Sequence, residues 1–384
     1  MSRSSTRFGQ RMICQQFLQP LCLLGSRSAR RSTGPEGSGS FGLPHAAEAR
    51  CPRRNRQSAA AVLASLALMV AAFVGASEFG LSQQVTSTVA AKPRLVGYLP
   101  NYEGSYADFA KTLDFTKMTH LNLIPAFPPK CHRRCTAKSD MTFSLGQSDA
   151  EIDALVSAAH EAGVKVLVTI CNSDNNNYPV LSQFYKAGLS SQLAASLDRF
   201  VTAHKFDGVD VDVETPTEMG APYDTFMAAL IAKLHPKGKI LSAAVAEWVQ
   251  SQNVMTLATL HAFDFLNVMV YSNLSDAKTG MAYFSSLDEP ASQMTLGVPF
   301  FGCNTDGSIC ETYATILAAY PNAWKMDEVS GGELDGGVAL HYVGEATMAK
   351  ETRLGKRYGG VMIWELAQDA SGPHSLLTVI QNKL

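Results

Sequence analysis

Short runs of apolar residues alternate with helix-like segments through most of the chain. The runs that we predict as buried strands are residues 95–99, 118–126, 164–170, 208–213, 240–246, 265–271, 295–300 and 360–364. Helix-like periodicity covers residues 150–162, 178–204, 223–234, 253–261, 313–320 and 345–354. Continuously apolar strands that alternate with helices are typical of a parallel sheet whose outer face is covered by helices.

Eight such strand and helix units occupy residues 93–384. This number and length predict a closed (β/α)8 TIM barrel, a fold of about 250 residues that tolerates insertions. An open doubly wound sheet is the alternative, but it is expected to carry a Gly-rich phosphate loop after the first strand. Residues 99–106 read LPNYEGSY and contain no such loop. We therefore predict an α/β barrel domain over residues 93–384.

The N-terminal part of the chain has a different composition. Residues 1–57 contain ten Arg, no Lys and two acidic residues, a net charge of +8. Removing these from the totals of 32 basic and 34 acidic residues leaves 22 and 32, so the remainder carries −10. Phosphate recognition needs a concentrated positive field. We therefore predict that the acidic body binds no nucleic acid and that residues 1–57 are a basic leader that does not fold.

Residues 58–77 read SAAAVLASLALMVAAFVGAS, after the basic sequence RRNR. A positive flank, an apolar run and small residues at its end are typical of a cleavable export signal. An uncleaved membrane anchor is the alternative, because about 20 apolar residues can span a bilayer. Residues 78–92 are predicted to be a polar linker. We expect a secreted protein or, alternatively, a membrane-anchored one whose folded domain lies outside.

Five cysteines follow the leader and the apolar segment. Export permits disulfides, and two close pairs, Cys131 with Cys135 and Cys303 with Cys310, are placed to close short bridges. Zinc binding is the alternative for the C-x3-C pair, but no second Cys/His pair follows at the spacing of a zinc finger. Cys171 ends an apolar strand pattern and is predicted to be a buried free thiol.

The fourth predicted strand carries the candidate chemistry. Residues 206–214 read FDGVDVDVE, and alternation places Asp210, Asp212 and Glu214 on one face and three valines on the other. In a barrel the valines pack against helices and the acids point inward. Glu214 ends the strand, at the face where barrel enzymes hold their active sites. The alternatives are a solvated edge strand and an Mg²⁺ or Ca²⁺ site, but no His joins the carboxylates.

This strand resembles the signature D-x-x-D-x-D-x-E of glycoside hydrolase family 18, and Asp207, Asp210, Asp212 and Glu214 fill its acidic positions. The resemblance extends over about 290 residues, through GYLPNY, THLNLIPAF, LNVMVYS and GGVMIWELAQD. It implies a glycosidase that needs no cofactor and no metal. By the same resemblance Glu214 is the general acid/base, Asp212 orients the substrate's acetamido group, and Asp210 and Asp207 support Asp212 from behind. Tyr271 would hydrogen-bond the acetamido oxygen.

Other residues are candidates for substrate binding. The resemblance places Trp364, at the end of the eighth strand, as the apolar floor beneath a sugar ring, with core packing as the alternative. Trp248 and Phe301, in predicted loops of the catalytic face, are candidates for sugar stacking or simple loop anchors. Phe127 and Ser272 complete the predicted substrate-binding set.

The chemistry of this acid cluster agrees with the resemblance. Protonating a glycosidic oxygen near neutral pH needs a carboxylic acid with a raised pKa, and neighbouring carboxylates raise it by repulsion. Family 18 enzymes use the substrate's own N-acetyl oxygen in place of a carboxylate nucleophile. This mechanism implies a 2-acetamido sugar beside the scissile bond.

Two segments depart from the family pattern. Residues 169–172 read TICN where the family tends to have Ser-x-Gly-Gly, and Ser272 stands where the family usually has Asp. Residues 300–360 must already include a helix, which leaves little room for the extra α+β wall of some chitinases. We therefore predict a barrel without a large insertion domain and with a shallow, open cleft.

Three functions follow from these observations. The first is a secreted, monomeric chitinase that cuts β-1,4-linked N-acetylglucosamine polymers. The second is an endo-β-N-acetylglucosaminidase that acts on N-glycan cores. The third is a non-hydrolytic chitin-binding lectin, against which the presence of Glu214 argues.

Overall fold

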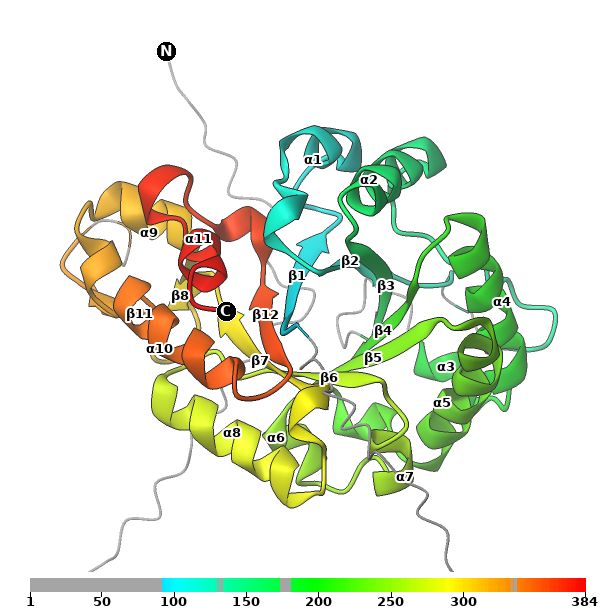
Figure 1. The fold of residues 1–384 in the computed structure, drawn as a ribbon. Helices are drawn as coiled ribbons and strands as arrows, with labels where there is room; N and C mark the ends of the chain where they lie inside the picture. Colours follow the sequence, from blue (N-terminus) through cyan, green and yellow to red (C-terminus); the bar gives the residue numbers. More distant parts are fainter. Residues whose placement is uncertain (1–91, 130, 132–133, 173–180, 333, 335–336) are drawn as a thin grey trace, which may run out of the picture. The chain divides into compact units, whose positions relative to one another are not determined.

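The computed structural model describes residues 92–129, 131, 134–172, 181–332, 334 and 337–384. The predicted leader, the apolar segment 58–77 and nearly all of the linker 78–92 lie outside these residues. Eight parallel strands close into a barrel in the order β1-β12-β7-β6-β5-β4-β3-β2 (Figure 1). They are β1 (Arg94–Pro100), β2 (His120–Ala126), β3 (Lys165–Asn172), β4 (Gly208–Val213), β5 (Ile240–Val245), β6 (Phe265–Val268), β7 (Met294–Pro299) and β12 (Gly360–Trp364). The predicted TIM barrel is confirmed, and the open sheet is excluded.

Helices surround the barrel on its outer side (Figure 1). They are α1 (Tyr106–Thr112), α2 (Asp149–Glu161), α3 (Ser182–Lys186), α4 (Ser190–Ala203), α5 (Ala221–Leu234), α6 (Glu247–Gln250), α7 (Leu257–Leu260), α8 (Leu274–Ser286), α9 (Tyr313–Ala319), α10 (Glu345–Gly355) and α11 (Leu376–Gln381). Among the described residues, no helix has the length and apolarity needed to cross a membrane.

Several element boundaries differ from the predicted ones. The predicted helix 178–204 is two helices, α3 and α4, separated by Gly188 at a φ of 77°, a conformation that ends a helix. The predicted helix 253–261 is limited to α7, because the Thr256 side chain accepts a hydrogen bond from Thr259 N and caps the helix there. The strand predicted over 265–271 ends at Val268. Helices α1, α6, α8 and α11 were not predicted.

The segment between β7 and β12 forms a small antiparallel sheet in the order β10-β11-β8-β9. Its strands are β8 (Phe301–Cys303), β9 (Cys310–Thr312), β10 (Glu328–Val329) and β11 (Leu340–His341). The absence of a large insertion domain is therefore confirmed, since strands of two or three residues build only a small addition to the barrel. Strands this short leave no readable alternation in the sequence.

Strand β4 is buried along its whole length. Val209, Val211 and Val213 belong to the apolar core between the barrel and its helices. Gly208, at the start of β4, lies so close to β5 that an added Cβ would meet Ile240 O at 2.1 Å. Only glycine permits this approach, which brings the acidic face of β4 next to the polar interior of β5.

Both predicted disulfides are present, Cys131–Cys135 and Cys303–Cys310. The zinc alternative is wrong, because the two sulfur atoms of the C-x3-C pair are bonded to each other. Cys171 is buried and free, as predicted.

Candidate active site

The site is built around Asp210, which is fully buried in the barrel interior. Its carboxylate accepts hydrogen bonds from side chains of four other strands. The donors are Tyr98 Oη at 2.7 Å, Thr169 Oγ1 at 3.1 Å, Ser242 Oγ at 2.6 Å and Asn267 Nδ2 at 3.2 Å. Burial raises the pKa of Asp210, and these four hydrogen bonds oppose the rise. Asp210 thus fixes β4 relative to β1, β3, β5 and β6.

The Asp210 network extends to both sides of the barrel. Asn267 Nδ2 also donates to Tyr98 Oη at 3.1 Å, and its Oδ1 accepts from Thr295 Oγ1 of β7 at 2.7 Å. The Tyr98 ring packs against Trp364, the last residue of β12, with ring centroids 5.6 Å apart. Trp364 is half-buried, so it packs on Tyr98 and keeps part of its surface accessible.

Asp212 and Glu214 lie further toward the C-terminal end of β4. Asp212 is 2% exposed and pairs in register with Cys171 of β3. Glu214 follows the strand and has a pKa well above the usual value for a glutamic acid. Burial is the largest cause, and the negative charge of Asp212 and the Cys171 thiol add to it. Glu214 is therefore a carboxyl group that keeps its proton at a higher pH than an exposed glutamate.

Tyr271 belongs to the same cluster. The pKa of Tyr98 is raised by its burial and then by Asp210, Asp212 and Tyr271, so the three groups act on one phenol. The Tyr271 hydroxyl donates to Met362 Sδ at 3.6 Å, and its ring meets Phe301 edge-on at 5.8 Å. The structure thus brings Tyr271 close to the acidic strand β4, as the sequence predicts. Tyr271 lies after the end of β6 and not within that strand.

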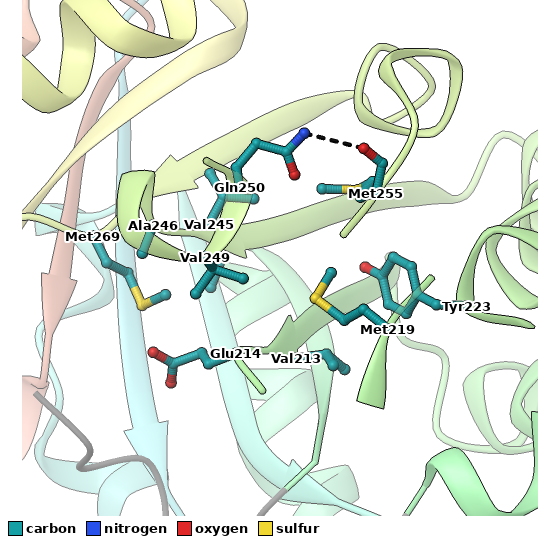
Figure 2. A pocket seen from close by; sticks show the side chains of 11 residues that line it. Val213, Glu214, Met219, Tyr223, Val245, Ala246, Val249, Gln250, Met255 and Met269 are labelled. Atoms are coloured by element: carbon teal, nitrogen blue, oxygen red, sulfur yellow. Dashed lines mark hydrogen bonds between the residues drawn. The ribbon is translucent and has the colours of Figure 1, made fainter. Parts of the chain in front are cut away.

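A small pocket adjoins Glu214 (Figure 2). Glu214 and Met269 lie on one side of it, and Met219, Tyr223 and Met255 lie on the other. Its volume is about 10 Å³, the space of roughly one water molecule. The pocket is therefore an apolar recess beside the acid and is too small to accept a sugar ring.

Asp207 is placed differently from the prediction, which grouped it with Asp210 behind Asp212. It precedes β4, and its carboxylate accepts hydrogen bonds from His160 Nε2 at 2.8 Å, Lys165 Nζ at 2.9 Å and Val166 N at 2.9 Å. Burial alone would raise its pKa, but these donors outweigh burial and lower it. Its partners place Asp207 at the N-terminal end of the barrel, away from Asp212, and its assignment to substrate binding stays a prediction.

Ser272, at the position where the family usually has Asp, donates to Asp276 Oδ2 at 2.6 Å. Asn273 Nδ2 donates to the same oxygen at 2.9 Å, and Asn273 caps α8 by accepting from Ser275 N and Asp276 N. A carboxylate therefore lies next to Ser272 although residue 272 itself has none. The sequence analysis missed Asp276, and the N-cap pattern of Asn273 was the signal that could have located it.

Cys171 was also missed as a site residue. Cys171 stands where the family tends to have glycine, but its register with Asp212 and its effect on Glu214 arise only from strand pairing. Trp248 and Phe127 follow the C-terminal ends of β5 and β2, at the same mouth of the barrel as Glu214. Trp248 is 42% exposed, and the part of both residues in substrate binding stays a prediction.

Comparison with known proteins agrees with this geometry. A crystal structure of a GH18 chitinase from Flavobacterium johnsoniae is 28% identical, covers 76% of this chain and 94% of its own, and has a TM-score of 0.65. A chitinase from Bacteroides thetaiotaomicron, 23% identical with a TM-score of 0.61, covers 76% of this chain and 96% of its own and shows the same fold. A chitinase-like effector of Moniliophthora perniciosa is 34% identical over 103 residues, which are 26% of this chain and 23% of the effector.

The family assignment rests on most of the chain. Residues 94–369 match the profile of Glycosyl hydrolases family 18, and this range begins at β1 and ends after β12. The closed barrel and the acidic fourth strand agree with that match. This chain therefore belongs to glycosyl hydrolase family 18.

Proposed function

We propose that the protein is a chitinase that cleaves β-1,4 linkages in N-acetylglucosamine polymers. The observation that carries this proposal is Glu214, whose raised pKa at the C-terminal end of β4 suits a general acid. Asp212 lies two residues before it, within β4. The family match and the chitinase structures named above support the substrate class.

The first chemical step follows from these two carboxyl groups. Protonated Glu214 donates its proton to the glycosidic oxygen, and the bond between that oxygen and the anomeric carbon breaks. The substrate's acetamido oxygen bonds to the anomeric carbon, which gives a cyclic oxazolinium ion. Asp212 orients the acetamido N–H and balances the positive charge of the ring.

In the second step Glu214, now a carboxylate, takes a proton from water. The water oxygen bonds to the anomeric carbon as the oxazolinium opens, and the acetamido group is restored. Two inversions at one carbon retain the β configuration. Asp210 makes no contact with substrate in this scheme and acts as a positioning residue, because its four hydrogen bonds hold β4 in the barrel.

We also propose that the protein is secreted, with membrane anchoring through residues 58–77 as the alternative. The two disulfides support an oxidising compartment outside the cytoplasm. Cell fractionation tests both forms, since a cleaved signal releases the domain and an anchor retains it with membranes.

Product analysis tests the activity and its substrate. The protein is incubated with chitin oligosaccharides, with partly deacetylated oligosaccharides and with a high-mannose glycoprotein. We expect cleavage of the first as β-anomers in a proton NMR time course, and almost none where the sugar beside the scissile bond lacks its N-acetyl group. Cleavage of the glycoprotein alone would indicate the endo-glycosidase, and binding without cleavage of any substrate would indicate a non-hydrolytic protein.

A further inference from the structure

The opposite mouth of the barrel, at the N-terminal ends of the strands, contains a cavity of about 300 Å³. Small-molecule sites begin at roughly this size. The residues of its lining that matter here are Arg94, His120, His235, Lys239, Asp264 and Phe265. None of them belongs to the active site described above.

Arg94, at the start of β1, is the central group of this cavity. Its guanidinium lies over the Phe265 ring of β6 at 4.6 Å, and it donates one hydrogen bond, to Ser292 O at 2.8 Å. Arginine has five N–H donors, and no carboxylate of the described residues lies within ion-pair distance of this one. Arg94 is half-buried, so a cation with spare donors faces a partly enclosed space.

A second cation lies across the mouth. Lys239, directly before β5, donates to Phe206 O at 2.6 Å and has no acidic partner within the described part of the chain. His120 packs edge-on against Phe265, with ring centroids 5.4 Å apart. Burial and then the charge of Arg94 lower the pKa of His120 to about 4, so at neutral pH His120 is an uncharged polar group of the lining.

Asp264, the acidic residue among those named in the lining, already accepts hydrogen bonds from the protein. Asp264 Oδ2 accepts from Leu241 N at 2.7 Å and from His235 Nε2 at 3.2 Å. Nearby, Asp207 is paired with Lys165 and His160. The cavity therefore holds the permanent charges of Arg94 and Lys239 against one engaged carboxylate, in a body that carries −10 from residue 58 onward.

We propose that this cavity is a binding site for a phosphate group, with Arg94 and Lys239 as its charged partners. Arginine offers paired N–H donors and lysine a compact charge, and both bind phosphate oxygens. Arg94 of β1 and Lys239, directly before β5, lie on opposite sides of the barrel mouth, so one polyvalent anion between them satisfies donors for which the described residues supply no partner. The phosphate belongs to free inorganic phosphate or to a small phosphate monoester.

Titration calorimetry on the full chain at pH 7 tests this site. Sodium phosphate and glycerol 1-phosphate are titrated separately, each against sodium chloride at equal ionic strength. We expect saturable binding of at least one of the two, with a melting temperature that rises with its concentration. The Arg94→Met and Lys239→Met variants keep the side-chain length and lose the charge, and each should weaken binding by about tenfold or more.

Two controls make the result decisive. Lys350→Met, on the exposed side of α10, should bind as tightly as the wild type, and so should Glu214→Gln, which separates this site from the proposed catalytic one. Absence of saturable binding for both anions would overturn the proposal. Equal affinity of Lys239→Met and the wild type would overturn it too, and this variant decides the matter if Arg94→Met does not fold.

Discussion

Two carboxyl groups at the two ends of β4 have pKa values that their surroundings shift in opposite directions. Asp207, at the N-terminal end, is held by Lys165, His160 and a backbone N–H, and its pKa is lowered. Glu214, at the C-terminal end, lies beside Asp212 with no cation among the causes of its shift, and its pKa is raised. The two acids belong to one sequence signature. Partners from α2 and β3 keep Asp207 a structural anion, whereas burial and the charge of Asp212 favour the protonated form of Glu214.

The largest expected effect tests the proton donor. Glu214→Gln keeps the shape of the side chain but has no proton to give, so turnover of chitin oligosaccharides should fall by about a hundredfold or more. Binding of the same oligosaccharides, measured by calorimetry, should survive. Glu161→Gln on the exposed end of α2 is the matched control. Turnover of Glu214→Gln near that of the wild type would contradict the proposed role of Glu214 as the proton donor.

The next effect concerns the charge that raises the pKa of Glu214. Asp212→Asn removes the neighbouring negative charge, so the pKa of Glu214 should fall toward its ordinary value. The alkaline limb of kcat/KM should then move to lower pH. Titration of the Glu214 carboxyl carbon by 13C NMR gives the same answer without turnover. A pKa that stays in place would show that the charge of Asp212 does not contribute to it.

A smaller effect, on stability, is expected at Asp210, which lies between Asp207 and Glu214. Asp210→Asn replaces a carboxylate that accepts four hydrogen bonds by an amide with a single acceptor oxygen. Buried donors left without partners should lower the free energy of unfolding by about 1–3 kcal/mol. Urea denaturation measures this loss. Asp288→Asn, at an exposed side chain after α8, should leave the midpoint unchanged.

The smallest effect belongs to Asp207, because its lysine partner is largely exposed. Its folded pKa is lowered, so its stabilisation is complete above the unfolded value of about 3.9 and is lost as the pH falls through the folded value. Asp207→Asn should therefore reduce stability by about 1 kcal/mol or less at pH 7, and the difference should shrink below about pH 4. Turnover at pH 7 should stay near that of the wild type. A loss as large as that of Glu214→Gln would place Asp207 in the catalytic machinery after all.

The sequence predicted the strands well, because continuous apolar runs in a parallel barrel have few alternatives. Seven of the eight begin within one residue of the predicted position, and β2 begins two residues later. The same alternation rule already separated Asp207 from Asp210, since residues three apart point to opposite faces of a strand. The family signature grouped them as neighbours, and the local geometry was the better guide.

Other parts of the site could not be predicted, for a physical reason. Cys171 contributes to the raised pKa of Glu214 through the pairing of β3 with β4, and Asp276 reaches Ser272 through the first turn of a helix that was not predicted. The cavity at Arg94 needs β1 and β6 to meet across the barrel mouth. Such contacts depend on closure of the whole sheet, which no local pattern encodes.

The hydrogen bonds around Asp210 also bear on the order in which the chain folds. Tyr98 and Asp210 are 112 residues apart, and Asn267 and Tyr98 are 169 residues apart. Closing loops of this length is slow, and contacts so distant form late. A chain that has completed only its first four strands therefore lacks two of the four donors to Asp210, Ser242 of β5 and Asn267 of β6. Asp210 acquires its last donor when β6 arrives, so a folding intermediate short of that stage holds β4 without all of the hydrogen bonds that fix it in the barrel.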